Sequence, residues 1–254
     1  MDGEGRDLLE HVGRVTRGAG DHLVVAADEL VEMLLAFHAR VLVDRHGRSV
    51  LSSSMTPWTT PTLEGRIVRL EPLVASHADD LWEASRDPRV WRWLPIVQPQ
   101  TREEWSGWID AALERTATGL ELAFATVLRE SGCAVGSTRY LALRPEHGSL
   151  EIGWTWLAPS AWGTGANTEA KLLQLEHAFE VFGCRRVEFK TDALNERARP
   201  ALASLPAQFE GIHRKHMLVR DGVNRDSAWY SVIDDEWPVV QAELRARLEG
   251  SQPL

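Results

Sequence analysis

Three strand-like segments in series, followed at once by a glycine-containing loop and a helix, most limit how this chain can fold. Short turns at Ser131-Gly132 and RPEHG separate the segments 120–130, 133–143 and 149–159. Such turns between apolar runs predict antiparallel hairpins. The stretch WGTGANTEAKLLQLEHAFE (162–180) comes next, with two glycines directly before an apolar helical stripe. We therefore expect strands that lead into a strand–loop–helix–strand unit.

The remaining elements extend this pattern. Before the hairpins we predict a half-buried strand at 65–73, a helix from Ser76 (its N-cap) to Arg86, and a helix opened by a Thr101–Glu104 capping box and ending near Gly119. After the loop we predict a strand (185–192), a short helix after Asn195, two strands (208–220 and 226–233) and a last helix (237–248). This order predicts an α+β fold with a mixed sheet.

The first 54 residues differ from the rest, because all 11 tryptophans lie between Trp58 and Trp237. We predict an N-terminal extension (1–54) of unknown function with one amphipathic helix, Leu23 to Leu42, and a second domain at 55–254. The extension is either a real appendage, or Met55 is the natural start and the preceding residues are an upstream addition.

Net charge, cysteine content and the lack of long apolar segments limit the kinds of partner and location expected for this chain. A formal net charge of −9 argues against nucleic acid or an anionic membrane as the main partner. Two lone cysteines, Cys133 and Cys184, give neither a disulfide framework nor a metal spacing. The first residues lack an apolar signal segment and no run approaches a membrane span. We expect a cytoplasmic protein without a metal.

The loop itself suits an anion. Gly163 and Gly165 permit positive φ and close approach of a ligand, and a helix with Thr168 as N-cap would present free N–H groups and the positive end of its dipole. The alternative is a plain strand-to-helix connection. The P-loop motif does not fit, because Ala170-Lys171-Leu172 stands where Gly-Lys-Ser/Thr is required, and a dinucleotide fingerprint lacks its third glycine at Thr168. A nucleotide-phosphate enzyme is therefore a disfavoured third option.

Taken together, the segments LEGRIVRLEPL (63–73), SLEIGWTWLAPSAWGTGANTEAKLLQLEHAF (149–179), CRRVEFKTDALNERA (184–198), FEGIHRKHMLVRDG and DSAWYSVIDDEWP resemble the GNAT superfamily of acyl-CoA-dependent N-acetyltransferases, in its RimJ/RimL-like branch. The resemblance covers about residues 58–238. It implies a twisted, mostly antiparallel sheet of about seven strands, flanked by helices and splayed between the fourth and fifth strands.

The resemblance also implies where acetyl-CoA binds. Main-chain amides of the loop would hold the pyrophosphate, here Trp162, Gly163, Thr164, Gly165, Ala166 and Asn167, with the helix opening at Thr168. The superfamily's Gln/Arg and Gly/Ala positions are occupied by Trp162 and Asn167. The pantetheine arm would enter the splay beside Trp156 and Leu157, where a main-chain N–H polarises the thioester. Asn195 would contact the cysteamine end, or act as a helix N-cap.

For the chemistry, the resemblance implies direct attack of an amine on the thioester, with a base near the splay. Glu151 is the first candidate base, and a structural ion pair is its alternative role. His213 or His216 could serve instead. Neither tyrosine, Tyr140 or Tyr230, stands where the superfamily's acid tyrosine usually falls.

The chain departs from its relatives after Asn195. Ala198 replaces a serine, Pro206 replaces the helix-ending glycine, and Pro200 is added. A proline inside a helix costs about 3 kcal/mol, and proline does not adopt the left-handed turn of a glycine. We expect a helix that starts late, kinks or frays. The alternative function is therefore a catalytically weak or inactive acyl-CoA-binding sensor or scaffold.

The acceptor side is predicted to be aromatic. Trp91, Trp93, Leu94 and Pro95, with Trp105 and Trp108, would wall the acceptor pocket, or simply cover the sheet. An acidic protein suits a cationic amine, either a small molecule or a protein N-terminus. We expect a monomer or homodimer.

Overall fold

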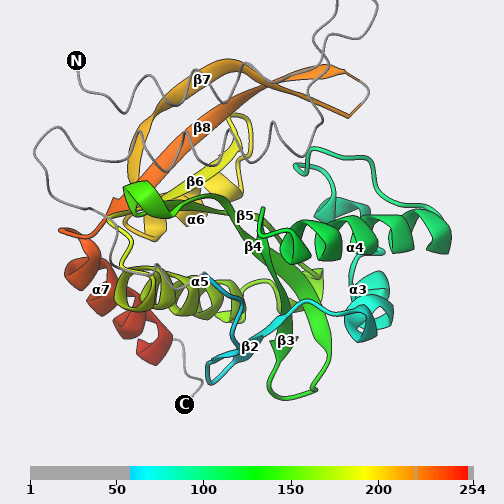
Figure 1. The fold of residues 1–254 in the computed structure, drawn as a ribbon, viewed down its shortest axis with the longest axis horizontal. Helices are drawn as coiled ribbons and strands as arrows, with labels where there is room; N and C mark the ends of the chain where they lie inside the picture. The colour runs from blue at the N-terminus through cyan, green and yellow to red at the C-terminus, as the bar shows by residue number, and fades with distance from the viewer. Residues whose placement is uncertain (1–57, 221, 251–254) are drawn as a thin grey trace, which may run out of the picture. The chain divides into compact units, whose positions relative to one another are not determined.

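A computed structural model describes residues 58–220 and 222–250 (Figure 1). The predicted helix at 23–42 and the boundary at 54/55 lie outside the described residues. The described chain forms one sheet in the order β1-β2-β3-β4-β5-β6-β8-β7. Its strands are β1 (Leu63–Glu64), β2 (Val68–Pro72), β3 (Leu122–Leu128), β4 (Ala134–Arg144), β5 (Ser149–Leu157), β6 (Arg186–Asp192), β7 (Gln208–Val219) and β8 (Val223–Ile233). All neighbours are antiparallel except β5 and β6.

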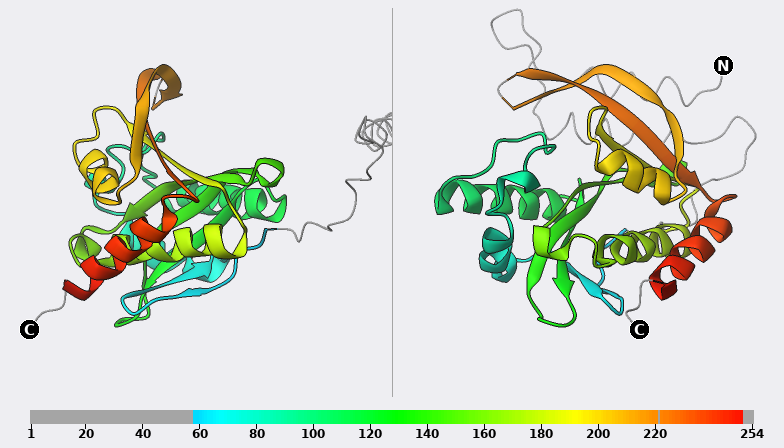
Figure 2. Two further views of the ribbon diagram at one scale, coloured as in Figure 1. Left: turned by 90° about the vertical axis from the view of Figure 1, so that its left-hand side faces the viewer. Right: turned by 180° about the vertical axis from the view of Figure 1, so that it is seen from behind.

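The predicted mixed α+β sheet is confirmed, and the seven expected strands are joined by the two-residue β1. Helices lie on both faces: α3 and α4 on one side, α5 and α7 on the other, as Figures 1 and 2 show. Their bounds, with that of the short α6, are α3 (Ala78–Ala84), α4 (Arg102–Ala117), α5 (Ala166–Glu176), α6 (Ala198–Ser204) and α7 (Trp237–Gly250). A π-helical turn, His177–Val181, continues α5.

The structure differs from the prediction at the first residues of two helices, α3 and α4. Ser76 is not an N-cap, because residues 75–77 form a 3₁₀ turn in which His77 Nδ1 accepts the Val74 N–H, and α3 begins only at Ala78. At α4, the Thr101 hydroxyl accepts the Glu104 N–H at 3.2 Å as predicted. The Glu104 carboxylate, however, reaches back to the N–H of Gln100 rather than that of Thr101. Local pattern thus locates both helices but not every capping bond.

Strand β3 is buried on both faces because its side chains alternate between two cores. Leu122 and Phe124 join the core under α5 and α7, whereas Ala123 and Ala125 join the core under α3 and α4. The small alanines leave room for large rings on that side, where Trp82, Trp91, Trp105, Trp108 and Trp156 pack together. The two packed faces hold the sheet rigidly beneath the site.

The short helix α6 accommodates its prolines. It starts at Ala198, so the expected late start is confirmed, and Pro200 falls in the first turn, where helical N–H groups have no partner in any case. Helix α6 ends with Leu205 as its C-cap, directly before Pro206.

The long β7–β8 hairpin stands above the rest of the sheet in Figure 1 and makes contact with the loop that follows α3. The Arg220 N–H donates to the Pro95 carbonyl at 3.0 Å, and the Arg220 guanidinium donates to the carbonyls of Trp91 and Arg92. The hairpin therefore fixes the loop Trp93–Pro95 over the centre of the sheet.

Candidate functional site

The loop between β5 and α5 turns through two glycines in the left-handed region. Gly163 has a φ of 77° and Gly165 a φ of 86°, values that residues with a side chain adopt only at a cost. Helix α5 begins at Ala166 with Gly165 as its N-cap. The prediction that Thr168 is the N-cap is wrong, because Gly165 already directs the chain into the helix and leaves Thr168 inside the first turn.

Most main-chain N–H groups of this loop are uncommitted. The Trp162 N–H donates to the Pro159 carbonyl at 3.1 Å and the Ala166 N–H to the Thr164 hydroxyl at 3.3 Å. Within residues 58–220 and 222–250, no acceptor is hydrogen-bonded to the N–H groups of Gly163, Thr164, Gly165, Asn167 or Thr168. The space is open as well, since a Cβ at Gly163 would meet no atom within 4 Å. Free donors at the positive end of a helix form a site for an anion.

Two arginines flank the same loop. The Arg197 guanidinium carbon lies 3.2 Å from the centre of the Trp162 ring, and that of Arg89 lies 5.2 Å away. The ring is fixed by its Nε1–H, which donates to the Leu157 carbonyl at 2.8 Å. Burial and the nearby Arg89 charge lower the pKa of Arg197. The Trp162 ring therefore forms a platform for two cations that distant segments contribute.

Strands β5 and β6 pair only at their beginning. Residues 149–151 pair with residues 186–188, and β5 then runs on to Leu157 with no partner on this side among the described residues. Trp154 has a φ of 49°, and the β4–β5 register shifts beside it. This irregularity bends β5 away from β6. The expected splay is confirmed, and it leaves main-chain groups of β5 beside Trp156 and Leu157 open to a ligand.

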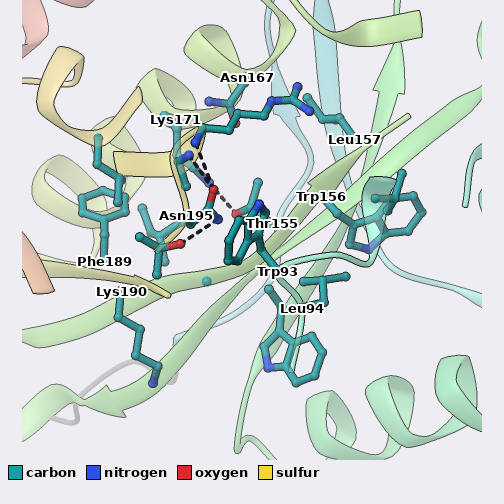
Figure 3. A pocket seen from close by; sticks show the side chains of 18 of the residues that line it. Trp93, Leu94, Thr155, Trp156, Leu157, Asn167, Lys171, Phe189, Lys190 and Asn195 are labelled. Carbon is teal, nitrogen blue, oxygen red and sulfur yellow. Dashed lines mark hydrogen bonds between the residues drawn. The ribbon is translucent and has the colours of Figure 1, made fainter. Parts of the chain in front are cut away.

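A cavity of about 710 Å³ occupies the splay and reaches the loop 162–168. Figure 3 shows Asn167 and Lys171 at one end of it and Lys190 at the other. Of the predicted aromatic wall, Trp93, Leu94 and Pro95 line the cavity. Trp91, Trp105 and Trp108 belong instead to the core under α3 and α4. They cover the sheet, which was their alternative role.

Glu151 stands at the fork of the two strands, 2% exposed and on the cavity wall. Its Oε2 accepts a hydrogen bond from Lys190 Nζ at 2.7 Å. Burial raises the pKa of the Glu151 carboxyl above its ordinary value, and the Lys190 charge opposes part of that rise. A carboxylate with a raised pKa, facing a cavity, has the properties of a general base, and it also makes the ion pair considered as its alternative role.

Asn195 lines the cavity and is 6% exposed. Its Oδ1 accepts the N–H groups of Arg197 and Ala198 at 3.2 and 2.9 Å, and its Nδ2 donates to Thr191 Oγ1 at 2.9 Å. The helix-capping role is therefore present. One amide hydrogen remains for a ligand, so the contact with the cysteamine end stays a prediction.

The other candidate acids and bases lie elsewhere. His213 stacks on Trp229 with ring centres 4.8 Å apart, and His216 Nδ1 is 3.0 Å from the Ser227 hydroxyl. Tyr140 is fully buried and donates to the Gln174 carbonyl, and Tyr230 packs against Phe209. None of the four lines the cavity formed by the described residues. Glu151 is thus the best placed of the candidate bases.

Lys171 is a buried lysine on α5 that sequence analysis missed as a site residue. Its Nζ donates to Thr155 Oγ1, Gln174 Oε1 and Thr138 Oγ1 at 2.8, 3.0 and 3.2 Å. No carboxylate pairs with it among the described residues, and burial lowers the pKa of its ammonium from 10.5 to about 7. It lies in the helical stripe taken as apolar, so only its charge could have drawn attention to it.

In the described part of the chain, no cluster of three or more metal-ligating side chains occurs, and no helix has the length and apolar character needed to cross a membrane.

Comparison with known proteins gives a consistent assignment. Residues 68–207 match the family described as Acetyltransferase (GNAT) domain. A GCN5-related N-acetyltransferase from Brucella melitensis is 36% identical with a TM-score of 0.71, over 75% of this chain and 86% of that one. The uncharacterized N-acetyltransferase p20 of Bacillus licheniformis is 24% identical over 61% of this chain and 86% of its own length. Mycobacterium smegmatis RimJ, in complex with CoA-disulfide, shares the fold at 24% identity and a TM-score of 0.64, over 75% of this chain and 95% of that one.

The family match covers more than half of the chain and contains the splay, Glu151 and the glycine loop. The resemblance drawn from the sequence is therefore confirmed, and this chain belongs to the GNAT acetyltransferase family.

Proposed function

We propose that this protein transfers an acetyl group from acetyl-CoA to a primary amine by direct attack. One observation carries the proposal: the loop 163–168 offers free N–H groups where β5 leaves β6, and Glu151 stands at that fork. The anion site and the site for proton transfer therefore lie at different places along one cavity.

The donor half fits a CoA thioester. The N–H groups of Gly163, Thr164, Gly165, Asn167 and Thr168 would hold the diphosphate, with Arg89 and Arg197 adding charge. The open edge of β5 at Trp156 and Leu157 would align the pantetheine arm as an added strand does. The CoA-disulfide bound to the RimJ relative supports this reading.

In the chemical step, the acceptor nitrogen forms a bond to the thioester carbonyl carbon and the carbon–sulfur bond breaks. Glu151 takes the proton that the amine loses, and the sulfur leaves as a thiolate that is then protonated. A main-chain N–H on the free edge of β5 would stabilise the negative charge on the carbonyl oxygen. The products are an amide and free CoA.

The acceptor is a small-molecule amine or a protein N-terminus. We place the reaction in the cytoplasm, without nucleic acid or membrane, with the protein as a monomer or homodimer. The unpaired thiols of Cys133 and Cys184 are consistent with a reducing setting.

A thermal-shift titration with acetyl-CoA, followed by free-thiol release with a panel of amines, tests the proposal. Acetyl-CoA is expected to raise the melting temperature. Gly163→Glu, which places a carboxylate among the free N–H groups, is expected to remove that rise. Gly119→Glu is the matched control, because Gly119 has a φ of 71°, open space around it and no part in the cavity.

Each outcome decides between functions. Binding without thiol release for any amine would favour the sensor or scaffold function over the enzyme. Stabilisation by ATP but not by CoA, or equal shifts in Gly163→Glu and the wild type, would contradict the location of the site.

A further inference from the structure

The acceptor side of the cavity holds a buried cation without a partner. Arg225 lies on β8, is 7% exposed and lines the cavity. Among the described residues its guanidinium makes no hydrogen bond or ion pair, and its Nε is fully buried. The charges of Asp192 and Glu151 act on Arg225 and raise its pKa, but neither carboxylate forms a hydrogen bond or ion pair with it. Glu151 Oε2 accepts from Lys190 Nζ at 2.7 Å, and Asp192 Oδ1 accepts the Leu194 N–H at 2.9 Å.

A buried guanidinium is costly unless an anion pairs with it. Burial lowers the pKa of Arg225, but a guanidinium cannot lose its charge in a protein, so neutralisation does not relieve the cost. Arg220, the neighbouring arginine, is held by the carbonyls of Trp91 and Arg92. The planar fork of donors of the Arg225 guanidinium therefore stays unused within residues 58–220 and 222–250.

The sheet register places Arg225 beside the reaction centre. Lys190 pairs with Trp229 and Asp192 with Ser227 across β6 and β8. Side chains on a strand alternate, so Trp229, Ser227 and Arg225 share the face that carries Lys190. Glu151 contacts Lys190 on this same face, and the Arg225 charge is close enough to Glu151 to influence its pKa.

The charged side chains that line the cavity are mainly positive, as Arg225 is. Basic side chains outnumber acidic ones six to two, although the whole chain carries a net charge of −9. Arg89 and Arg197 account for the charge at the diphosphate loop, at the other end of the cavity. The net charge favoured a cationic acceptor, whereas the mainly basic lining of the cavity favours an anionic group on it.

We propose that Arg225 binds a carboxylate on the acceptor, so that the substrate is a small amine that also carries a carboxylate and an apolar body. The amine would face Glu151 while the two carboxylate oxygens accept paired hydrogen bonds from the guanidinium. Trp93, Leu94 and Met217, which also line the cavity, would contact the apolar body. This inference rests on the proposed acetyl transfer and selects a small amino acid-like acceptor over a protein N-terminus.

The test compares three matched amines with acetyl-CoA as donor: leucine, leucinamide and 3-methylbutylamine. Leucine is expected to have a KM about tenfold or more below that of the other two. In Arg225→Gln, that advantage is expected to disappear through a rise in the KM for leucine, so that the KM values of the three amines become similar. Arg214→Gln removes the same charge from an exposed position on the neighbouring strand β7 and is expected to change nothing.

Two further measurements keep the outcomes distinct. Arg225→Gln should fold and bind acetyl-CoA as the wild type does, because removing an unpaired buried charge does not weaken the native state. Equal KM values for the three wild-type amines, preference for a peptide N-terminus, or an unchanged leucine KM in Arg225→Gln would overturn this inference. Loss of acetyl-CoA binding or of all turnover in the wild type would instead overturn the proposed function.

Discussion

Two turns beside the first residues of α5 offer clusters of main-chain N–H groups and treat them differently. At residues 65–68, the Glu169 carboxylate accepts the N–H groups of Arg66, Ile67 and Val68 at 2.9, 2.6 and 2.7 Å. At residues 163–168, all N–H groups except that of Ala166 have no partner in the described chain. The first turn uses these groups to bind an anion supplied by the chain itself, and we propose that the second turn uses them to bind an anionic ligand. Loop geometry alone does not distinguish the two.

Removal of the internal anion should have the largest effect. Glu169→Ala leaves three N–H groups without an acceptor beside a buried strand, at a cost of about 3 kcal/mol or more in unfolding free energy. Urea denaturation measures it. Glu176→Ala is the control on the same helix, because that carboxylate pairs with Arg245 at the surface and should cost less than about 1 kcal/mol. Equal losses in both variants would contradict the special role of the 65–68 turn.

Lys171 follows Glu169 by two residues on α5 and is also buried. Whereas the Glu169 carboxylate accepts three N–H groups, the Lys171 ammonium donates only to neutral oxygens. Its folded pKa of about 7 lies below the unfolded value of 10.5, so between these pH values the unfolded chain binds a proton that the folded chain does not. Unfolding free energy should therefore rise with pH across that window, by roughly 2 kcal/mol between pH 7.5 and 9.5. Lys171→Met should lack this rise. Parallel pH profiles for the two proteins would show that Lys171 titrates normally.

The two turns also differ in the room that each leaves for a side chain, and a pair of alanine substitutions can measure this difference. A Cβ at Gly65 would lie 2.4 Å from Glu169 Oε2, whereas one at Gly163 meets nothing within 4 Å. Gly65→Ala should lower the unfolding free energy by about 2 kcal/mol through overpacking. Gly163→Ala should cost about 1 kcal/mol, from its positive φ alone. The reverse order in thermal denaturation would mean that the turn 163–168 is the filled one.

The smallest effect is expected at the rim of the open turn. Arg197→Gln removes one of the two charges stacked near Trp162 and should weaken acetyl-CoA binding about fivefold, an effect that shrinks in high salt. Arg86→Gln is the control, since Arg86 lies over Trp82 at 4.7 Å and does not line the cavity. Isothermal titration calorimetry measures the affinity for acetyl-CoA. Equal affinities for Arg197→Gln and wild type would show that Arg197 is not part of the site.

Much of the site could be predicted from short stretches of sequence. Turn residues and alternating apolar positions located β3, β4, β5 and β6, and the resemblance placed Glu151 beside the splay. Errors occurred where a neighbouring residue or a long-range contact overrides the expected pattern. Gly165 rather than Thr168 is the N-cap of α5, because its left-handed turn already directs the chain into the helix. Trp91, Trp105 and Trp108 became core because Ala123 and Ala125 leave them space on the underlying strand.

By itself, the sequence determined the order of strands and helices, the glycines of the loop and the family, because these depend on neighbours within a few residues. Only the tertiary structure decided which N–H groups of the described residues stay free, which cations surround Trp162, and which buried arginine has no hydrogen bond or ion pair among those residues. Glu169 and the 65–68 turn are about one hundred residues apart in the chain, and Arg225 and Glu151 lie on different strands of the sheet. Pairing between such distant groups is set by packing of the whole sheet, which no local pattern encodes.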